Sequence, residues 1–182
     1  DEVLQAGDPQ FDALTIAAYK ADISKQQGRS ELGVDALREV LSSSSDEELS
    51  LKANLLLANL FSELGRTEES IAILEPLDEI SANFASAAIY MSKNKFADAS
   101  DQYETLAAKL PEDPNEQTVR VFRPDGSRPG LVEIFLPRHA IFEQYSECLA
   151  RSGRPAEAQA IFDGLPSPQD DRDKAARALI QS

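Results

Sequence analysis

The chain has 182 residues, of which 32 are acidic and 18 are basic, so its formal net charge is −14. Hydrophobic residues make up 42% and charged residues 27%, which is typical of a globular domain. The acidic balance argues against nucleic acid and anionic membrane surfaces as partners, because both attract clustered Lys and Arg. No stretch approaches the run of about 18 apolar residues that crosses a bilayer, so direct membrane insertion is not expected.

The chain has one cysteine, Cys148, and one histidine, His139. A single cysteine excludes an internal disulfide and a multi-cysteine metal site. His139 has no nucleophile motif near it in sequence, and Cys148 lies in an apolar helical segment, so we interpret both as structural. The phosphate-binding glycine motifs and the nucleophile-elbow motif are absent. We therefore expect no catalytic residue, metal site or cofactor, and predict that the chain is not an enzyme.

The chain begins with Asp1 and Glu2 rather than with methionine. Our interpretation is that a signal or anchor segment has been removed, or that this is a piece of a longer protein. Together with the acidic balance and the single cysteine, this favours an extracytoplasmic location such as the bacterial periplasm. The cytoplasm is the alternative.

Helix start and stop signals divide most of the chain into pairs of helices. Each pair has an apolar helix, a turn residue that tolerates the left-handed conformation, and a second apolar helix. The turn residues are Gly28, Gly65, Asn94 and Gly153. The predicted pairs span residues of about 9–43, 46–78, 81–111 and 137–165. A last helix is expected over about 168–181.

Capping residues indicate where several of these helices begin. Asp8 followed by Pro9 is typical of an N-cap and the first helical position, and predicts the start of the first helix. The acidic segment 44–48 predicts the start of the third helix, because negative charge is stabilised at the positive end of the helix dipole. Ser81 is predicted to cap the first helix of the third pair.

Small and aromatic residues recur at fixed positions within the pairs. The third pair has Ala87 and Tyr90 on its first helix, Ala99 and Tyr103 on its second, and Pro111 at its end. This pattern resembles the tetratricopeptide repeat (TPR), a helix–turn–helix unit of about 34 residues. The small residues at matching positions of the other pairs are Ala21 and Gly33, Ala58 and Ser70, and Ser146 and Ala158.

The resemblance implies an all-α fold in a single TPR-like domain over residues 1–182. We expect a right-handed α-solenoid of about four TPR-like helix pairs, in which each pair buries its apolar side on the next. The last predicted helix, over about 168–181, would cover the C-terminal end of the solenoid as a capping helix.

Residues of about 117–136 depart from the helical pattern. Thr118–Phe122 and Leu131–Phe135 are runs of β-branched and aromatic residues with rough alternation, which is typical of strands. The segment 124–130 between them is rich in proline and glycine. The sequence therefore predicts a β-hairpin inserted between the third and fourth pairs. Because a lone two-stranded hairpin is marginal in water, it must lie on the helices, pair with another strand, or order on binding.

The resemblance also implies a concave groove formed by the first helix of each pair. The residues expected to bind a partner there are Tyr19, Asp22, Leu55, Asn59, Phe84, Ala88, Glu143 and Glu147. Other residues expected on the same face include Ala18, Lys25, Lys52, Leu56, Glu63, Ala85, Met91 and Gln144. The set is apolar in its middle and acidic at its ends, so a peptide or protein segment with apolar and basic residues would complement it. Leu55, Leu56 and Phe84 are equally open to being core residues.

We predict a non-enzymatic protein–protein interaction module, or scaffold, that binds a peptide or partner protein in this groove. The alternative is a structural or self-association domain of a larger or membrane-anchored assembly. In that case a homo-oligomer would form through the hairpin or through one end of the solenoid, because unpaired strand edges template pairing with another chain.

Overall fold

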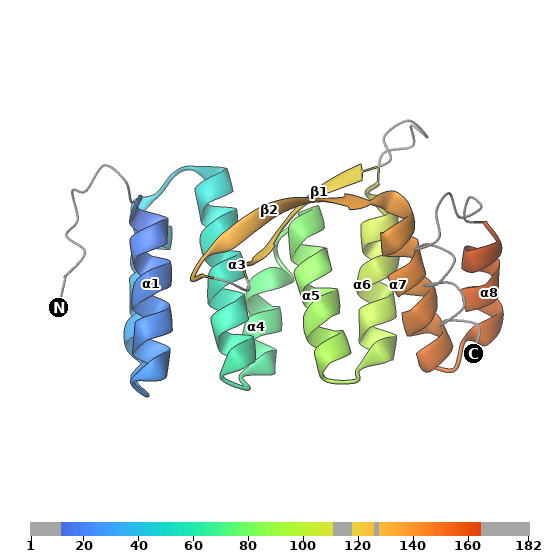
Figure 1. Ribbon diagram of the computed structural model, residues 1–182, viewed down its shortest axis with the longest axis horizontal. Helices are drawn as coiled ribbons and strands as arrows, with labels where there is room; N and C mark the ends of the chain where they lie inside the picture. The colour runs from blue at the N-terminus through green and yellow to red at the C-terminus, as the bar shows by residue number, and fades with distance from the viewer. Residues whose placement is uncertain (1–11, 111–117, 126–127, 165–182) are drawn as a thin grey trace. The chain divides into compact units, whose positions relative to one another are not determined.

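The computed structural model describes residues 12–110, 118–125 and 128–164. It is mostly helical, with consecutive packed helix pairs and one small antiparallel sheet, as a TPR-like α-solenoid requires (Figure 1). In chain order the elements are α1 (Ala13–Gln26), α2 (Ser30–Ser43), α3 (Glu47–Glu63), α4 (Thr67–Leu74), α5 (Ile80–Ser92), α6 (Phe96–Ala108), β1 (Thr118–Pro124), β2 (Leu131–Pro137), α7 (Arg138–Arg151) and α8 (Pro155–Asp163). The predicted inserted hairpin is confirmed. The predicted capping helix over 168–181 lies outside the described residues.

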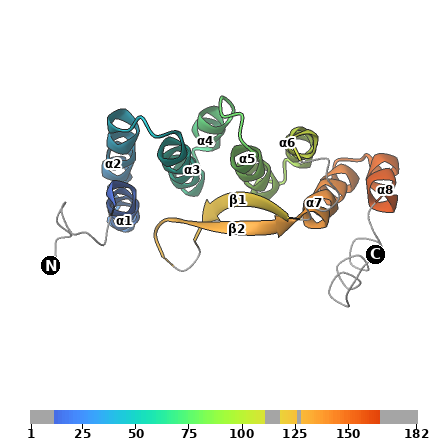
Figure 2. The same ribbon diagram turned by 90° about the horizontal axis from the view of Figure 1, so that it is seen from above.

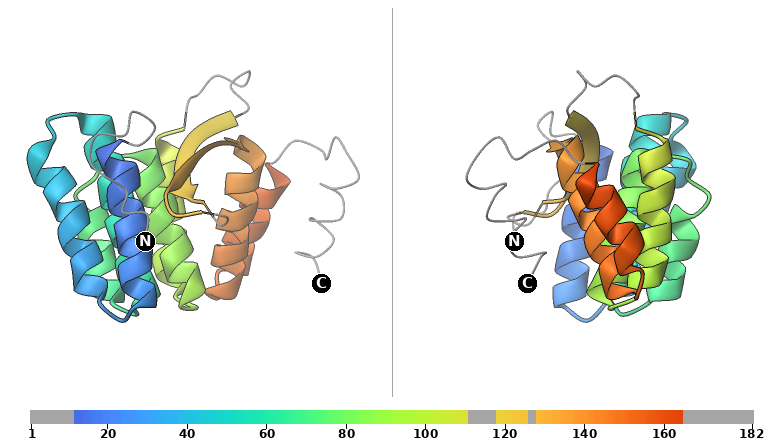
Figure 3. Two further views of the ribbon diagram at one scale, coloured as in Figure 1. Left: turned by 60° about the vertical axis from the view of Figure 1, so that its left-hand side comes forward. Right: turned by 90° about the vertical axis from the view of Figure 1, so that its right-hand side faces the viewer.

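The chain divides into two compact units. Unit 1 comprises the chain up to Ser86 together with Arg120–Ile134, and unit 2 comprises Ala87–Val119 and the chain from Phe135 onward. In unit 1, α1 packs on α2, α2 on α3, and α3 on α4 (Figure 2). In unit 2, α6 packs on α7 and α7 on α8 (Figure 3). The expectation of one domain over residues 1–182 stays a prediction.

The turns between paired helices are made by the residues that the sequence indicated. Gly28, Gly65 and Gly153 have φ values of 69°, 76° and 85°, and Asn94 has a φ of 57°. This left-handed region carries little penalty for glycine and a modest one for asparagine. The four predicted helix turns are therefore confirmed.

The two helices of the first pair approach most closely at small residues. A Cβ atom added to Gly33 would lie only 2.6 Å from the Cα atom of Ala21. Such a separation is well inside van der Waals contact, so only glycine fits at this point of α2. The match between Ala21 and Gly33 in the sequence pattern thus reflects a backbone contact.

Two other pairs join the same positions by a buried hydrogen bond. In the second pair, the Ser70 hydroxyl on α4 donates to the Ala58 carbonyl on α3 over 2.5 Å. In the fourth pair, the Ser146 hydroxyl on α7 donates to the Ala158 carbonyl on α8 over 2.9 Å. The serine lies on the second helix in the second pair and on the first helix in the fourth pair, with the alanine on the opposite helix each time. The contact between the two helices is the same in both pairs.

Unit 1 has a continuous hydrophobic core between its helices. Its buried members come from α1, α2 and α3: Leu14, Ala17, Ala18, Ala21, Val34, Leu37, Val40, Ala53, Leu56, Leu57, Leu60 and Phe61. Leu131 at the start of β2 packs against this core although it is far away in sequence. The hairpin is therefore part of the packing of unit 1.

The helix starts confirm one capping prediction and correct another. Asp46 caps α3, since its side chain accepts a hydrogen bond from the Leu49 backbone N–H over 3.0 Å. The described part of α1 begins after Asp12, which accepts from the Thr15 backbone N–H over 2.7 Å, and the predicted cap Asp8 lies outside the described residues. Ser81 is not a cap, because α5 begins at Ile80 and the Ser81 hydroxyl is used by the hairpin instead.

Candidate functional site

The inserted hairpin lies on the helices of unit 1. Val121 and Phe122 of β1 are 0% and 5% exposed, and the Phe122 backbone N–H donates to the Ser81 hydroxyl on α5 over 3.0 Å. The Lys52 ammonium on α3 lies 4.7 Å from the centre of the Phe122 ring, a cation–π distance. Of the three arrangements that the sequence left open for the hairpin, packing on the helices is the one found in unit 1.

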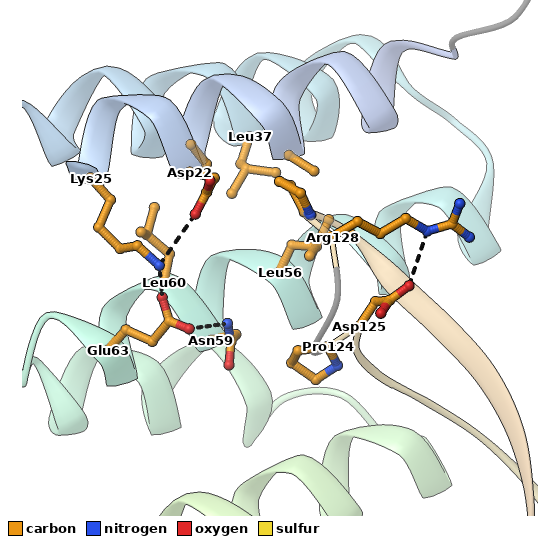
Figure 4. Close-up of a pocket in the computed structure, with 14 residues that line it drawn as sticks. Asp22, Lys25, Leu37, Leu56, Asn59, Leu60, Glu63, Pro124, Asp125 and Arg128 are labelled. Atoms are coloured by element: carbon orange, nitrogen blue, oxygen red, sulfur yellow. Dashed lines mark hydrogen bonds and ion pairs between the residues drawn. The ribbon is translucent and has the colours of Figure 1, made fainter. Parts of the chain in front are cut away.

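A pocket of about 390 Å³ lies between α1, α3 and the hairpin turn (Figure 4). Its volume is at the small end of the range for ligand sites in proteins. Its apolar lining is Ala18, Ala21, Leu37, Leu56, Leu60, Pro124, Pro129 and Gly130. Its polar and charged lining is Asp22, Lys25, Asn59, Glu63, Asp125 and Arg128.

One side of the pocket is a charged cluster that joins α1 to α3. The Lys25 ammonium lies 2.6 Å from Glu63 Oε2 and 3.5 Å from Asp22 Oδ1. The Asn59 amide donates to Glu63 Oε1 over 3.2 Å, and the Gln26 amide donates to Asp22 Oδ2 over 2.6 Å. The hydrogen bond to Glu63 is the main reason why the pKa of Lys25 is raised. Lys25 is therefore held as a cation between two carboxylates.

The opposite side of the pocket is the hairpin turn. The Arg128 guanidinium donates from Nε to Asp125 Oδ2 over 3.0 Å, and the Asp125 backbone N–H donates to the Gly130 carbonyl over 3.0 Å. The Asp125 side chain is only 15% exposed, whereas that of Arg128 is 72% exposed. The carboxylate therefore faces the protein, and its cation lies in solvent.

The repeat pattern in unit 1 is matched by comparison with known proteins. Residues 51–84 match the family model described as tetratricopeptide repeat. The chain therefore carries a TPR-like segment over these residues. The search of curated proteins and the search of solved structures gave no match. TPR repeats generally mediate protein–protein interaction, and the family is typically non-enzymatic. The matched segment covers most of α3, all of α4 and the start of α5, and overlaps the second pair expected over about 46–78.

The pocket is lined by several residues that the sequence placed on the groove face. Asp22 and Asn59 line it, and so do four members of the wider set, namely Ala18, Lys25, Leu56 and Glu63. These six come from α1 and α3, as expected for the first helices of two consecutive pairs. Their role in binding a partner stays a prediction.

Other predicted residues of unit 1 lie elsewhere. Leu55 is 3% exposed and does not line the pocket, so it is a packed core residue. Tyr19 and Phe84 are half-buried and do not line the pocket. Lys52 is placed against the Phe122 ring of the hairpin. The hairpin thus covers part of the face that the sequence left open for a partner.

The remaining predicted residues belong to unit 2. Ala88 on α5 is exposed, and Glu143 and Glu147 on α7 are half-buried. The Arg151 guanidinium lies 2.8 Å from Glu147 Oε1, one helical turn away. The role of these three residues in binding a partner protein stays a prediction.

The buried hydroxyl and thiol of unit 2 are held neutral. The Tyr103 hydroxyl donates to Gln144 Oε1 and lies 3.6 Å from the Met91 sulfur. Burial raises the pKa of Tyr103, and it raises the pKa of the Cys148 thiol to about 11. Neither group is activated as a nucleophile, because each favours its protonated form at neutral pH.

The described residues carry neither a metal-binding cluster nor a membrane-spanning helix. Within these residues, no group of three or more His, Cys, Asp or Glu side chains is arranged to hold a metal ion. None of the helices described here is both long enough and apolar enough to span a membrane.

Asp125 and Arg128 were not anticipated as site residues. They lie in a turn that sequence reasoning assigned to the hairpin, and nothing in the local pattern shows which helices that turn will contact. Their position depends on the buried anchor of β1 at Ser81, which is a long-range contact.

Proposed function

We propose that this TPR-like protein is a non-enzymatic interaction module that binds a peptide or a segment of a partner protein. The observation that carries this proposal is the pocket between α1, α3 and the hairpin turn. Its walls are formed by the first helices of two consecutive pairs, the face on which stacked repeats carry their binding surfaces. It combines an apolar lining with several charged groups at its edges, which suits recognition of a polypeptide.

A selection experiment tests this proposal. A library of displayed random peptides is panned against the immobilised full chain, and enriched peptides are measured in solution by fluorescence anisotropy. We expect enriched peptides to bind Asp22→Asn about tenfold more weakly than the wild type, because a charge-assisted contact contributes roughly this factor.

The matched control is Asp35→Asn. Asp35 is an exposed carboxylate on α2 that does not line the pocket, so the control removes the same charge elsewhere on unit 1. It should leave the affinity unchanged. If no peptide is enriched over an unrelated acidic protein, or if both variants bind as the wild type does, the proposed function is wrong.

Self-association remains a second candidate because of Phe135. This β2 side chain is 63% exposed and stands on a strand of a two-stranded sheet. Exposed apolar residues on an edge strand favour pairing with another chain. Deleting the whole hairpin is an unsuitable test, because Val121 and Phe122 are buried.

The better test is Phe135→Ser, with light scattering across a range of protein concentrations. Self-association through the hairpin predicts a wild-type mass above 19.9 kDa that falls to this monomer value in the variant. A wild-type mass of one monomer at every concentration would contradict this candidate.

A further inference from the structure

The hairpin limits what can reach the binding face of unit 1. The Phe122 backbone N–H is hydrogen-bonded to Ser81 on α5, and the Phe122 ring contacts the Lys52 ammonium on α3. The turn that follows forms one wall of the pocket. The space that remains open is about 390 Å³. A helix with its side chains is about 10–12 Å wide, so a helical ligand does not fit this space. An extended segment can enter it with a single side chain.

The lining of the pocket selects the chemistry of that side chain. Leu56 and Leu60 provide an apolar wall, and the carboxylates Asp22, Glu63 and Asp125 lie at its edges. A long side chain with an aliphatic stem and a cationic head matches both parts at once. Lysine and arginine have this chemistry.

The protein already places a cation of its own at this position. The Lys25 ammonium lies between Glu63 and Asp22, at 2.6 Å and 3.5 Å (Figure 4). Its side chain is 34% exposed, and a lysine head sits on a four-carbon stem with rotatable bonds, so it can turn out to solvent without opening the core. On the opposite wall, the cation paired with Asp125 is the still more exposed Arg128. A cationic side chain of a partner can therefore take the place of either Lys25 or Arg128.

We propose that the pocket receives one arginine or lysine side chain from an extended segment of a partner protein. The incoming charged head replaces Lys25 between Asp22 and Glu63, and its stem lies along Leu56 and Leu60. The net charge of −14 draws a basic segment toward the protein and speeds its association. This inference rests on the proposed function, and it specifies which residue of the partner the pocket recognises.

Defined peptides test the inference on the full chain. The probes are fluorescein-labelled pentapeptides of sequence Ala-Ser-X-Ser-Ala, in which X is arginine, lysine or citrulline. Citrulline has nearly the shape of arginine but no charge. We expect the arginine and lysine probes to bind about tenfold more tightly than the citrulline probe, because a charged partner strengthens a hydrogen bond by roughly this factor. Glu63→Gln should remove most of this difference.

The variant that tests the proposal most directly is Lys25→Met, because it removes the native cation that competes with the probe. It should tighten binding of the arginine probe about threefold or more, since the incoming head no longer has to displace Lys25. Lys20→Met is the matched control: it removes one exposed cation from the same helix outside the pocket. Equal affinities for the two variants would overturn the proposal, because long-range charge alone would then explain the effect.

Circular dichroism establishes that each variant is folded, and Asp22→Asn replaces any variant that is not. Backbone amide shifts in NMR then locate the probe, with changes expected around Asn59 and Gly130. Equal binding of the arginine and citrulline probes, together with selected peptides that lack basic residues, would overturn this inference and leave the proposed function standing. Failure of every peptide in both experiments would overturn both.

Discussion

At the crossing of α1 and α2, Gly33 has no space for any side chain. An added Cβ would meet the Ala21 backbone at 2.6 Å, and a backbone atom cannot move aside as a flexible side chain does. Gly33→Ala would gain about 1 kcal/mol of helix propensity if the site were open. We expect the crowding to exceed this gain and to lower the free energy of unfolding by about 1 to 3 kcal/mol, measured by urea denaturation.

Gly164→Ala is the control for this substitution. Gly164 has right-handed backbone angles, and a Cβ atom added there would lie 3.4 Å from the Ile161 carbonyl oxygen, which is ordinary contact. Its stability should change by less than about 0.5 kcal/mol. A Gly33→Ala variant at least as stable as the wild type would show that the two helices separate at little cost.

Cys148 gives a second prediction at the scale of one residue. Its side chain is 0% exposed, and burial raises the pKa of its thiol to about 11. Because only the thiolate reacts, we expect slow labelling by a thiol reagent in native protein at pH 8 and fast labelling in urea. Labelling at the same rate in both conditions would contradict the burial of Cys148.

The raised pKa of Cys148 also makes stability depend on pH. The neutral thiol is favoured in the folded protein, so its contribution is fully present below the pKa of the unfolded chain, about 8.5, and is lost as the pH rises toward 11. The free energy of unfolding should therefore fall over this range. In Cys148→Ala this fall should be smaller, as urea denaturation at several pH values would show.

Sequence reasoning succeeded for individual residues where one helix determines the outcome. The resemblance to the repeat placed Asp22 and Asn59 on the face of their own first helices, where both line the pocket, and the turn glycines followed from the left-handed conformation that they adopt. Ser81 was misassigned as a cap, because its true partner, the Phe122 N–H, is distant in sequence. The spacing of Leu55 in the sequence is consistent with either a core or a surface position. Its burial in the structure shows that it is a core residue.

At the scale of elements, a common arrangement recurs at the start of two second helices. Arg66 precedes α4 and pairs with Glu69 through two hydrogen bonds of 2.6 Å, while Arg154 precedes α8 and pairs with Glu157 at 2.8 and 2.7 Å. In each case the hydrogen bond lowers the pKa of the glutamate. Exposed ion pairs of this kind contribute little stability. The pair is therefore a shared feature of these two repeats and not a main source of their stability.

The attachment of the hairpin is a stronger contact between elements. Ser81→Ala would leave the buried Phe122 N–H without its acceptor. A buried donor without a partner costs about 1 to 3 kcal/mol, so we expect a loss of stability of this size. Hydrogen exchange at the Phe122 amide should also become faster.

Ser92→Ala is the matched control on the same helix. Ser92 is an exposed residue whose hydroxyl donates to the Ile89 carbonyl of its own helix, so its removal should change stability by less than about 0.5 kcal/mol. Unchanged exchange of the Phe122 amide in Ser81→Ala would argue against the serine as the anchor of the hairpin.

The elements themselves were predictable because each helix carries its own start, stop and apolar spacing. The hairpin was also recognised, since the strand runs and the turn between them are local signals. Its docking was not predictable, because Phe122 and Leu131 pack against helices more than 30 residues earlier in the chain. The half of the pocket formed by the turn was missing from the predicted site for the same reason.

At the scale of the whole molecule, the net charge of −14 opposes folding through repulsion among like charges. Added salt screens this repulsion. We expect the free energy of unfolding to rise by on the order of one to two kcal/mol between 20 mM and about 300 mM NaCl. The melting temperature should therefore rise by a few degrees. Scanning calorimetry measures this directly.

A double variant, Asp35→Asn with Glu39→Gln, serves as the control. It removes two exposed acidic charges from α2 and should show a smaller rise with salt than the wild type. If the melting temperature falls with salt instead, local ion pairs such as that of Lys25 with Glu63 outweigh the global repulsion.

Because β1 and the start of β2 return to unit 1 after the chain has already left it, the order of synthesis and the order of assembly differ. A ribosome releases α1 to α4 long before it releases Val121 and Phe122, so the nascent chain exposes the surface around Ser81 until the hairpin emerges. Any truncation between α6 and β1 would remove the hairpin and leave that surface exposed to solvent. A fragment intended for expression therefore has to extend beyond Ile134, even when only the first four helices are of interest.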